Sequence, residues 1–508
     1  MICTYYLIFC RRAILQNRDV LSTTPWSNLL ENDFWGTPLT HNGSHKSYRP
    51  ICTATFKLNY LISGFQPWSY HLVNVILHSI ATFLFMSLAE IVLKTRLSIF
   101  LAGTIFALHP IHCEAVAGLV GRADLLSAIF FIASLISFNC HCKLRDKIKK
   151  KKDVIRGHEN VSSGSECDES VSQKVQFDAN GNVLVCSKKH QVLSVVKPKF
   201  QKTKSKQFHK ENSIFTFAES FYLLLSIFFA GCSMFSKEQG ITVLGVCFII
   251  DTSRMLTQHR NTFSRSNSRR VKSLITLIAA TIVLLFLRAK MMGYSSPSFA
   301  KADNPASASE SFLTRTLTFL FLPFLNFWLV ACPSTLSFDW SMNSIELVNH
   351  FGDLRNVATF AFFVLLTVII VKTAKNIFQG KVSKNTDIIV TSMSIMMLSF
   401  VPASNLFFYV GFVIAERVLY IPSIGFCLIS GFCVARVIEK SLERRRKMIV
   451  HRVAICLTAV LILSLGVRTV RRNEDWRNEE NLYRAGIAIN PPKGKFSNLS
   501  LSRLSSVR

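Results

Sequence analysis

Long apolar segments alternate with short polar ones along most of the chain. Phe215–Phe235 holds a single charged residue, and Leu274–Leu287 holds none. A helix rises about 1.5 Å per residue, so about 20 apolar residues cross the ~30 Å hydrocarbon core of a bilayer. The pattern therefore predicts an all-α polytopic membrane protein with about ten transmembrane helices. The expected spans are 71–93, 97–109, 124–139, 214–234, 239–252, 271–289, 357–371, 387–403, 418–435 and 450–467.

Composition and charge sharpen this prediction. Half of the 508 residues are hydrophobic, 18% are charged and 42 are Phe, which excludes a disordered chain and disfavours an ordinary soluble domain. A net charge of +29 could indicate a nucleic-acid partner. Most Lys and Arg residues, however, fall in the connections 94–97, 140–212, 253–272, 372–384 and 436–452. These lie on one side of the predicted membrane, so the positive-inside rule makes that side cytosolic and explains the charge without nucleic acid.

The opposite side, lumenal or extracellular, receives the larger polar loops. The predicted parts are an N-terminal remnant with the first lumenal loop (1–70), transmembrane helices (71–139), a basic disordered cytosolic loop (140–212), a transmembrane core (213–468) with a lumenal loop at 290–356, and a lumenal tail (469–508). Leu317–Val330 is apolar, but one more crossing would invert the basic loops that follow. We expect it to enter and leave on the lumenal side or to lie along the interface.

The first lumenal loop holds a dense polar cluster, Asn32–Gly36 followed by Ser44–Pro50. Its Asp33, His45 and Arg49 stand among aromatic residues, which could hold a sugar by stacking and a phosphate by cationic hydrogen bonds. The alternative is an amphipathic interface helix with its Trp residues at headgroup depth.

Further polar clusters stand at predicted membrane boundaries on the same side. They are His109–Glu114 with His112, Gly121–Asp124 with Arg122, Ser236–Gly240 with Lys237 and Glu238, and Ala415–Tyr420 with Glu416 and Arg417. Each could be a paired or snorkelling helix end. Charges at such positions are costly unless they line a wet site, and the cations could neutralise a phosphodiester. The cluster at His109–Glu114 lacks a fourth ligand, so no metal is assigned.

No nucleotide-binding or hydrolase fingerprint is present, which leaves a carrier, a channel or an enzyme with a lipid-borne substrate. Together the motifs resemble the TMTC family, the transmembrane and tetratricopeptide-repeat-containing O-mannosyltransferases. The stretches that carry this resemblance are Asn32–Gly36, Ser44–Pro50, His109–Asp124, Lys237–Gly240, Cys332–Trp340, Ala415–Pro422 and Asn473–Pro492. Gln66–His78 is most similar to the type-two branch of that family.

The resemblance implies a GT-C type glycosyltransferase core in the endoplasmic reticulum membrane. Such an enzyme takes mannose from dolichyl-phosphate mannose, uses no cofactor, and places the sugar on Ser or Thr of cadherin-type acceptor domains. The reaction needs a carboxylate to deprotonate the acceptor hydroxyl and cations to stabilise the leaving phosphate. Substrate-binding residues are expected among His45, Arg49, His109, His112, Arg122, Asp124, Lys237, Glu238, Glu416 and Arg417.

The chain departs from the family pattern at both ends. Phe9 and Cys10 stand where the family has an acidic pair, so Asp33 is the substitute candidate for the catalytic carboxylate. The tail is expected to be truncated before the tetratricopeptide array, and this chain to transfer mannose poorly. The alternative is a non-catalytic membrane protein of the endoplasmic reticulum that binds the donor lipid or a full-length relative. A transporter or channel would instead need polar residues in mid-membrane.

Overall fold

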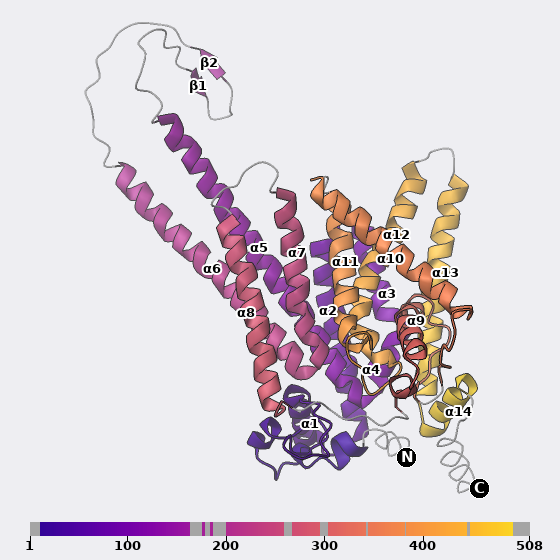
Figure 1. Ribbon diagram of the computed structural model, residues 1–508. Coiled ribbons are helices and arrows are strands. Elements are labelled where there is room, and N and C mark those ends of the chain that lie inside the picture. Colours follow the sequence, from indigo (N-terminus) through magenta and orange to yellow (C-terminus); the bar gives the residue numbers. More distant parts are fainter. Residues whose placement is uncertain are drawn as a thin grey trace, which may run out of the picture. The chain divides into compact units, whose positions relative to one another are not determined.

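The computed structural model is helical throughout its membrane-spanning part (Figure 1). It describes residues 11–162, 175–177, 183–185, 200–258, 267–294, 303–341, 344–380, 383–443 and 448–490. The chain forms two compact units, one of residues 1–138 with 224–508 and one of residues 139–223. The polar clusters named above all belong to the first unit.

Ten helical segments of the described chain are long and apolar enough to cross a membrane. They are Pro67–Val92, Leu119–Ile148, Ser213–Ser236, Glu238–Thr257, Ser268–Met291, Phe312–Ala331, Arg355–Phe378, Lys384–Ala403, Glu416–Leu442 and Met448–Asp475. Every predicted span except 97–109 coincides with one of them, which confirms the all-helical polytopic architecture. The exception corresponds to α3 (Arg96–Leu108), which is followed after a 44° bend by Pro110–Ala117. Pro110 has no N–H to continue the helix, which accounts for the break.

The described chain contains further α-helices besides α3. They are α1 (Pro50–Ser63), α2 (Pro67–Val92), α4 (Cys113–Ala117), α5 (Arg122–Ser162), α6 (Phe200–Ser236), α7 (Thr242–Gln258), α8 (Asn267–Met291), α9 (Phe312–Ala331), α10 (Arg355–Phe378), α11 (Lys384–Phe400), α12 (Tyr420–Glu443), α13 (Met448–Asp475) and α14 (Glu479–Ile489). Short 3-10 turns, η7 (Glu238–Ile241) and η10 (Glu416–Leu419), precede α7 and α12.

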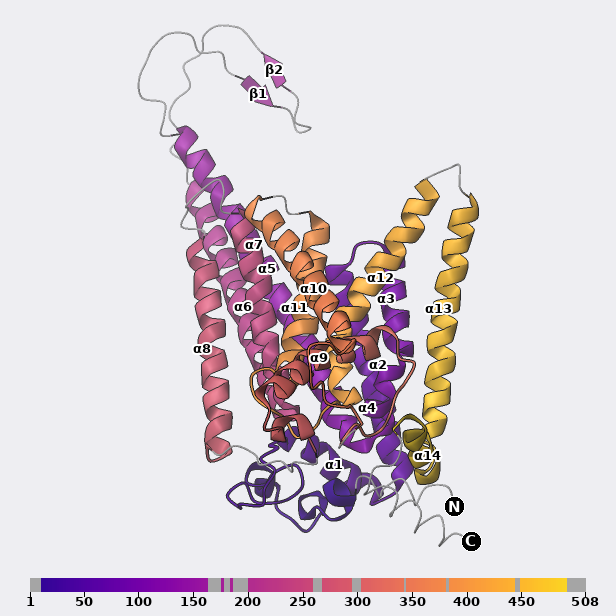
Figure 2. The same ribbon diagram turned by 45° about the vertical axis from the view of Figure 1, so that its right-hand side comes forward.

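Helix α9 contains the apolar stretch whose path the sequence left open. It qualifies as a span by length and composition. In Figures 1 and 2 it nevertheless lies across the long helices, near the end of the unit that carries α1, α4 and α14. It packs on α10 and η10, and Pro323 lies within it. The path of this helix along one side of the membrane stays a prediction.

The second unit holds the predicted cytosolic loop 140–212. Helix α5 continues to Ser162 and α6 begins at Phe200, so the non-helical part is shorter than predicted at both ends. Lys is a good helix former, which lets a basic segment extend a helix already nucleated in the membrane. Between them lies an antiparallel pair, β1 (Val175–Phe177) and β2 (Val183–Val185).

Reciprocal serine hydrogen bonds join α5 and α6. Ser127 Oγ donates to the carbonyl of Ser233 at 3.1 Å, and Ser233 Oγ donates to that of Ser127 at 2.8 Å. Ser134 and Ser226 repeat the exchange at 2.8 and 3.0 Å. Small hydroxyl residues allow two helix backbones to approach closely in a membrane, so these pairs fix the register of α5 on α6.

Glycines set the packing of α12. A Cβ added at Gly431 would lie 2.6 Å from the backbone nitrogen of Ala102 on α3. A Cβ at Gly425 would lie 2.2 Å from the carbonyl oxygen of Ser392 on α11. Helix α12 therefore packs backbone to backbone against both neighbours, and it directly follows the polar turn η10.

Replacing Gly431 with Val should lower stability, because the added side chain overlaps the backbone of α3. Overpacking of this kind costs about 1–3 kcal/mol. The matched control is Gly466→Val on α13, where the nearest atom to an added Cβ is Leu108 Cδ1 at 3.9 Å. Thermal unfolding of both variants in one detergent checks this, and equal midpoints would contradict it.

Candidate functional site

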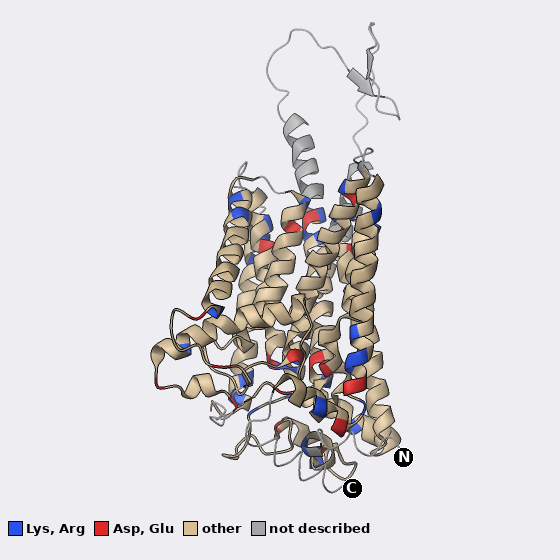
Figure 3. Cartoon of the chain, turned by 90° about the vertical axis from the view of Figure 1, so that its right-hand side faces the viewer, with Lys and Arg blue, Asp and Glu red and all other residues tan. Residues whose placement is uncertain are grey.

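Charged residues lie toward both ends of the helices, and those toward the end that carries α1 are joined by ion pairs. Figure 3 shows Lys, Arg, Asp and Glu close together in its lower half, below a middle zone with little charge. Three of the ion pairs described below, Arg49–Glu238, Lys237–Asp124 and Arg417–Glu114, join residues more than 100 positions apart in the sequence.

Glu238 is held by two arginines. Arg49, which directly precedes α1, donates from Nε and Nη2 to the two carboxylate oxygens at 3.3 and 3.1 Å. Arg288 on α8 donates from Nη2 to Oε1 at 2.9 Å and from Nη1 to the carbonyl of Tyr48 at 3.2 Å. The Glu238 side chain is 37% exposed, against 17% for Arg49. A bidentate arginine and a second arginine thus converge on one partly accessible carboxylate.

Lys237 directly precedes Glu238 in the sequence and forms an ion pair with Asp124 on α5. Both side chains are buried. Burial lowers the pKa of Lys237, the attraction of Asp124 opposes this, and repulsion from Arg49 and Arg417 lowers the pKa further. Lys237 therefore lies within electrostatic range of both Arg49 and Arg417.

Arg417 supplies the third cation from η10. Its Nη1 lies 3.5 Å from Glu114 Oε1, and its backbone N–H donates to Glu114 Oε2 at 2.9 Å. The Glu114 side chain is buried, whereas that of Arg417 is 38% exposed. We call Arg49, Lys237 and Arg417 the cation cluster. The structure thus brings together five of the predicted site residues, namely Arg49, Asp124, Lys237, Glu238 and Arg417.

Arg122, also predicted to bind substrate, is instead fully buried. Its guanidinium donates to Asn74 Oδ1 at 2.9 Å, Asn59 Oδ1 at 3.0 Å, and the carbonyls of Tyr70 and Thr55 at 2.9 and 3.3 Å. These contacts tie α5 to α1 and α2. The geometry favours a structural role for Arg122 over contact with a phosphate.

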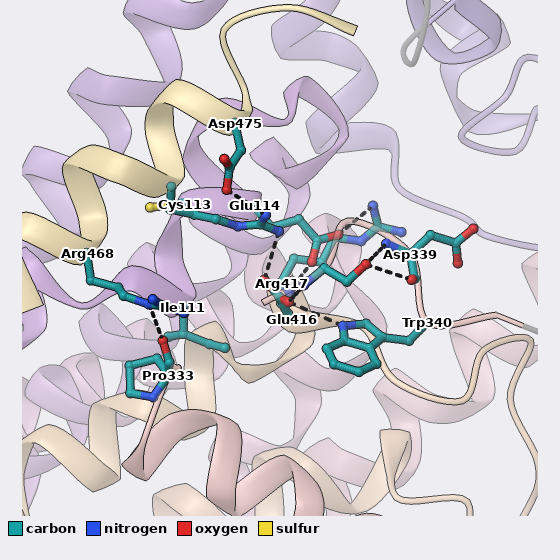
Figure 4. A network of polar contacts seen from close by, with 12 residues as sticks. Ile111, Cys113, Glu114, Pro333, Asp339, Trp340, Glu416, Arg417, Arg468 and Asp475 are labelled. Carbon is teal, nitrogen blue, oxygen red and sulfur yellow. Dashed lines mark hydrogen bonds and ion pairs between the residues drawn. The ribbon is translucent and has the colours of Figure 1, made fainter. Parts of the chain in front are cut away.

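Glu416 is fully buried beside Arg417 (Figure 4). Its Oε1 accepts from the Ser337 backbone N–H at 2.6 Å and from Trp340 Nε1 at 3.2 Å. Its Oε2 lies 3.5 Å from Arg472 Nη2, whose Nη1 also pairs with Asp475 at 3.2 Å. Glu416 therefore anchors η10 to the segment that carries Ser337 and Trp340 and to α13.

Two of the three predicted histidines, His109 and His112, are buried. His109 Nε2 lies 3.0 Å from the carbonyl of Val330, and its Nδ1 accepts from the Ile111 N–H at 3.2 Å. His112 Nε2 lies 2.8 Å from Ser423 Oγ. Both rings are 2% exposed, which favours packing roles. Within the described residues no group of three or more His, Cys, Asp and Glu is arranged to hold a metal.

Asp33, the predicted substitute base, is buried within the first loop. Its carboxylate accepts four hydrogen bonds, from the N–H groups of Trp35 at 2.9 Å, Thr37 at 3.0 Å and His45 at 3.1 Å, and from Ser44 Oγ at 2.7 Å. An ionised carboxylate has about four acceptor sites, so no site remains for an acceptor hydroxyl. Asp33 therefore folds the loop, and this geometry argues against a base.

The other predicted positions of this region lie apart from the cluster or outside the described residues. His45 is exposed, with Nε2 3.3 Å from Arg12 Nη1. Phe9 and Cys10 lie outside the part of the chain that the structure describes. The first loop contacts the cation cluster through Phe34, whose ring lies 5.2 Å from the guanidinium carbon of Arg49.

Several residues of the site escaped prediction. Arg288 stood within the predicted span 271–289 and was not singled out, and Arg472 stood on the side that the positive-inside rule makes poor in cations. Asp19 carried no motif, although both carboxylate oxygens accept from Asn32 at 2.9 and 3.0 Å. Burial raises the pKa of Asp19, and the Asn32 hydrogen bond opposes that rise. For Arg288 and Arg472 the signal in the sequence was a charge near the end of a predicted span with no assigned partner.

Replacing Asp33 with Asn should destabilise the first loop. The amide presents a donor to groups that also donate, and a buried donor without a partner costs about 1–3 kcal/mol. The exposed Glu31→Gln is the control within the same loop. Limited proteolysis of the full chain measures the effect, and equal cleavage of both variants would contradict the structural role.

Comparison with known proteins adds a family context. A family model described as "Protein O-mannosyl-transferase TMTC, DUF1736" matches residues 293–367. The chain is 37% identical to Protein O-mannosyl-transferase tmtc2 of Xenopus laevis and 38% identical to TMTC2 of Homo sapiens, over 97% of this chain and 57% of each relative. It is 34% identical to TMTC3 of Mus musculus over 98% of this chain and 47% of that protein. The chain thus spans about half the length of these relatives. No solved structure matches it.

Proposed function

The chain belongs to the TMTC family of protein O-mannosyl-transferases, and from this premise we propose that it moves mannose from a lipid-phosphate donor to protein hydroxyl groups. The donor would be dolichyl-phosphate mannose and the acceptors Ser or Thr of cadherin-type domains. The protein is a multi-pass membrane protein, and we place it in the endoplasmic reticulum membrane with the cation cluster on the lumenal side.

The observation that carries this proposal is the charge balance of the cation cluster taken together with Arg288 and the carboxylates that pair with them. Four cations, Arg49, Lys237, Arg288 and Arg417, face three carboxylates, those of Glu114, Asp124 and Glu238. Four minus three leaves one positive charge, which suits the single negative charge of a phosphodiester. The exposed side chain of Arg417 is the group best placed to meet such an anion.

The same cluster suits the chemistry of transfer. The bond between the sugar carbon C1 and the phosphate oxygen breaks, and C1 bonds to the acceptor oxygen. The leaving lipid phosphate gains a negative charge, which pre-positioned cations stabilise. The acceptor hydroxyl gives its proton to a base, and a donor already activated as a phosphate ester needs no nucleotide site.

One observation favours a second candidate function. The carboxylate predicted as the base, Asp33, has all its acceptor sites occupied by loop donors. A chain with donor-binding cations but without a base would bind the lipid donor without transferring the sugar. It would act as a non-catalytic membrane protein of the endoplasmic reticulum, alone or with a full-length relative.

Replacing Arg417 with Ala should weaken binding of dolichyl-phosphate mannose. Loss of one charge-assisted contact with phosphate costs about 1.5–3 kcal/mol, or roughly 10- to 100-fold in affinity. The control is Arg484→Ala, because Arg484 lies on α14 and pairs only with Glu480 among the contacts described for it. Binding to the purified chain in lipid nanodiscs measures the difference.

The same preparation decides between the two functions. Mannose transfer to a cadherin-domain substrate, lost in Arg417→Ala, supports the enzyme. Donor binding without any transfer by the unaltered chain supports the second function. Unchanged donor affinity in Arg417→Ala would reduce Arg417 to a structural partner of Glu114 and remove the main support for both.

A further inference from the structure

A short lumenal loop links the C-terminal helix to the cation cluster. We call Pro333–Trp340 the clamp loop. Ser337 and Trp340 of this loop donate to Glu416, as described above, and Arg468 on α13 donates from Nε to the carbonyl of Pro333 at 2.8 Å (Figure 4). The loop is therefore fixed from one side by the turn that carries Arg417.

Helix α14 holds the clamp loop from the other side. Asn490, the C-cap of α14, donates from Nδ2 to Ser337 Oγ at 3.1 Å and to the carbonyl of Asp339 at 2.8 Å. The ring of Tyr483 lies 5.4 Å from that of Phe338 in an edge-on arrangement. A Cβ added at Gly486 would lie 2.4 Å from Phe338 Cε1, so this glycine lets the helix approach the loop closely.

The contacts form one continuous path. Asn490 binds Ser337, the Ser337 N–H binds Glu416, and the residue after Glu416 is Arg417. Glu416 is fully buried and its ion pair with Arg472 is largely shielded from water. Removing one partner of a buried ion pair is costly, so Glu416 is expected to stay in place between Ser337 and Arg472. A fixed Glu416 in turn keeps the clamp loop and η10 in one relative position.

We propose that Glu416 is a positioning residue that couples α14 to Arg417, so that displacement of α14 from the clamp loop weakens the hold of Arg417 on the donor phosphate. This inference rests on the proposed function, which gives Arg417 its role toward phosphate. A ligand or protein segment that moves α14 would then change donor affinity without touching the cation cluster.

The test removes a single side chain at the far end of the path. Asn490→Ala takes away two hydrogen bonds from the clamp loop and leaves Glu416 and Arg417 intact. Glu480→Gln is the matched control, because Glu480 lies on α14 and pairs with Arg484 on its exposed side. Glu416→Gln is the second variant, since it keeps the size of the side chain and removes its charge.

Two properties of each variant are measured on the full chain in nanodiscs, backbone hydrogen exchange and affinity for a lipid phosphate. Hydrogen exchange follows the backbone amides of Ser337 and Arg417, which donate to Glu416 and Glu114. A short-chain polyprenyl phosphate reports anion affinity. In Asn490→Ala both amides should exchange about fivefold faster, the factor expected for loss of one net hydrogen bond, and the lipid Kd should rise about three- to fivefold. Glu416→Gln should exceed both effects, and Glu480→Gln should show neither.

Other outcomes overturn the proposal. A faster Ser337 amide beside an unchanged Arg417 amide would confine the effect of Asn490 to the clamp loop. Faster exchange at both amides with an unchanged Kd would separate the path from phosphate binding. If the unaltered chain binds no polyprenyl phosphate, the proposed function fails, and the Arg417 amide alone then decides whether α14 and η10 are coupled.

Discussion

The pairing of buried charges at one membrane boundary is the constraint on which this structure depends. A charge removed from water is tolerated only when an opposite charge and hydrogen-bonding groups replace its hydration. Asp124, Glu114 and Glu416 are nearly inaccessible, and each meets a cation from a distant part of the chain. These ion pairs also hold η7, η10 and the first loop against the helices.

The pairs also divide the charged residues by role. Arg122 and Arg472 are enclosed by protein acceptors and fasten helices to one another. Arg417 and Glu238 keep more than a third of their side-chain surface accessible. The difference lies in exposure and not in residue type, because the same guanidinium group serves both purposes.

Sequence patterning predicted nine of the ten candidate spans, because hydrophobic length is a property of the chain itself. It could not identify the ion-pair partners, since Arg49 and Glu238 are brought together only by packing. Arg122 and Asp33 were therefore given chemical roles that their complete sets of hydrogen bonds disfavour. The helical continuation of α5 past the membrane was also hidden, since a basic stretch resembles a loop in composition alone.

The serine pairs between α5 and α6 have a consequence for evolution. Ser127 and Ser134 are seven residues apart, as are Ser226 and Ser233, and Asp124 and Lys237 continue the same antiparallel row. Residues added in the connection between Ser134 and Ser226 leave this alignment unchanged, so the connecting segment can differ in length without disturbing these pairs. One residue inserted between Asp124 and Ser127 would turn the carboxylate by about 100° around the helix and separate it from its lysine.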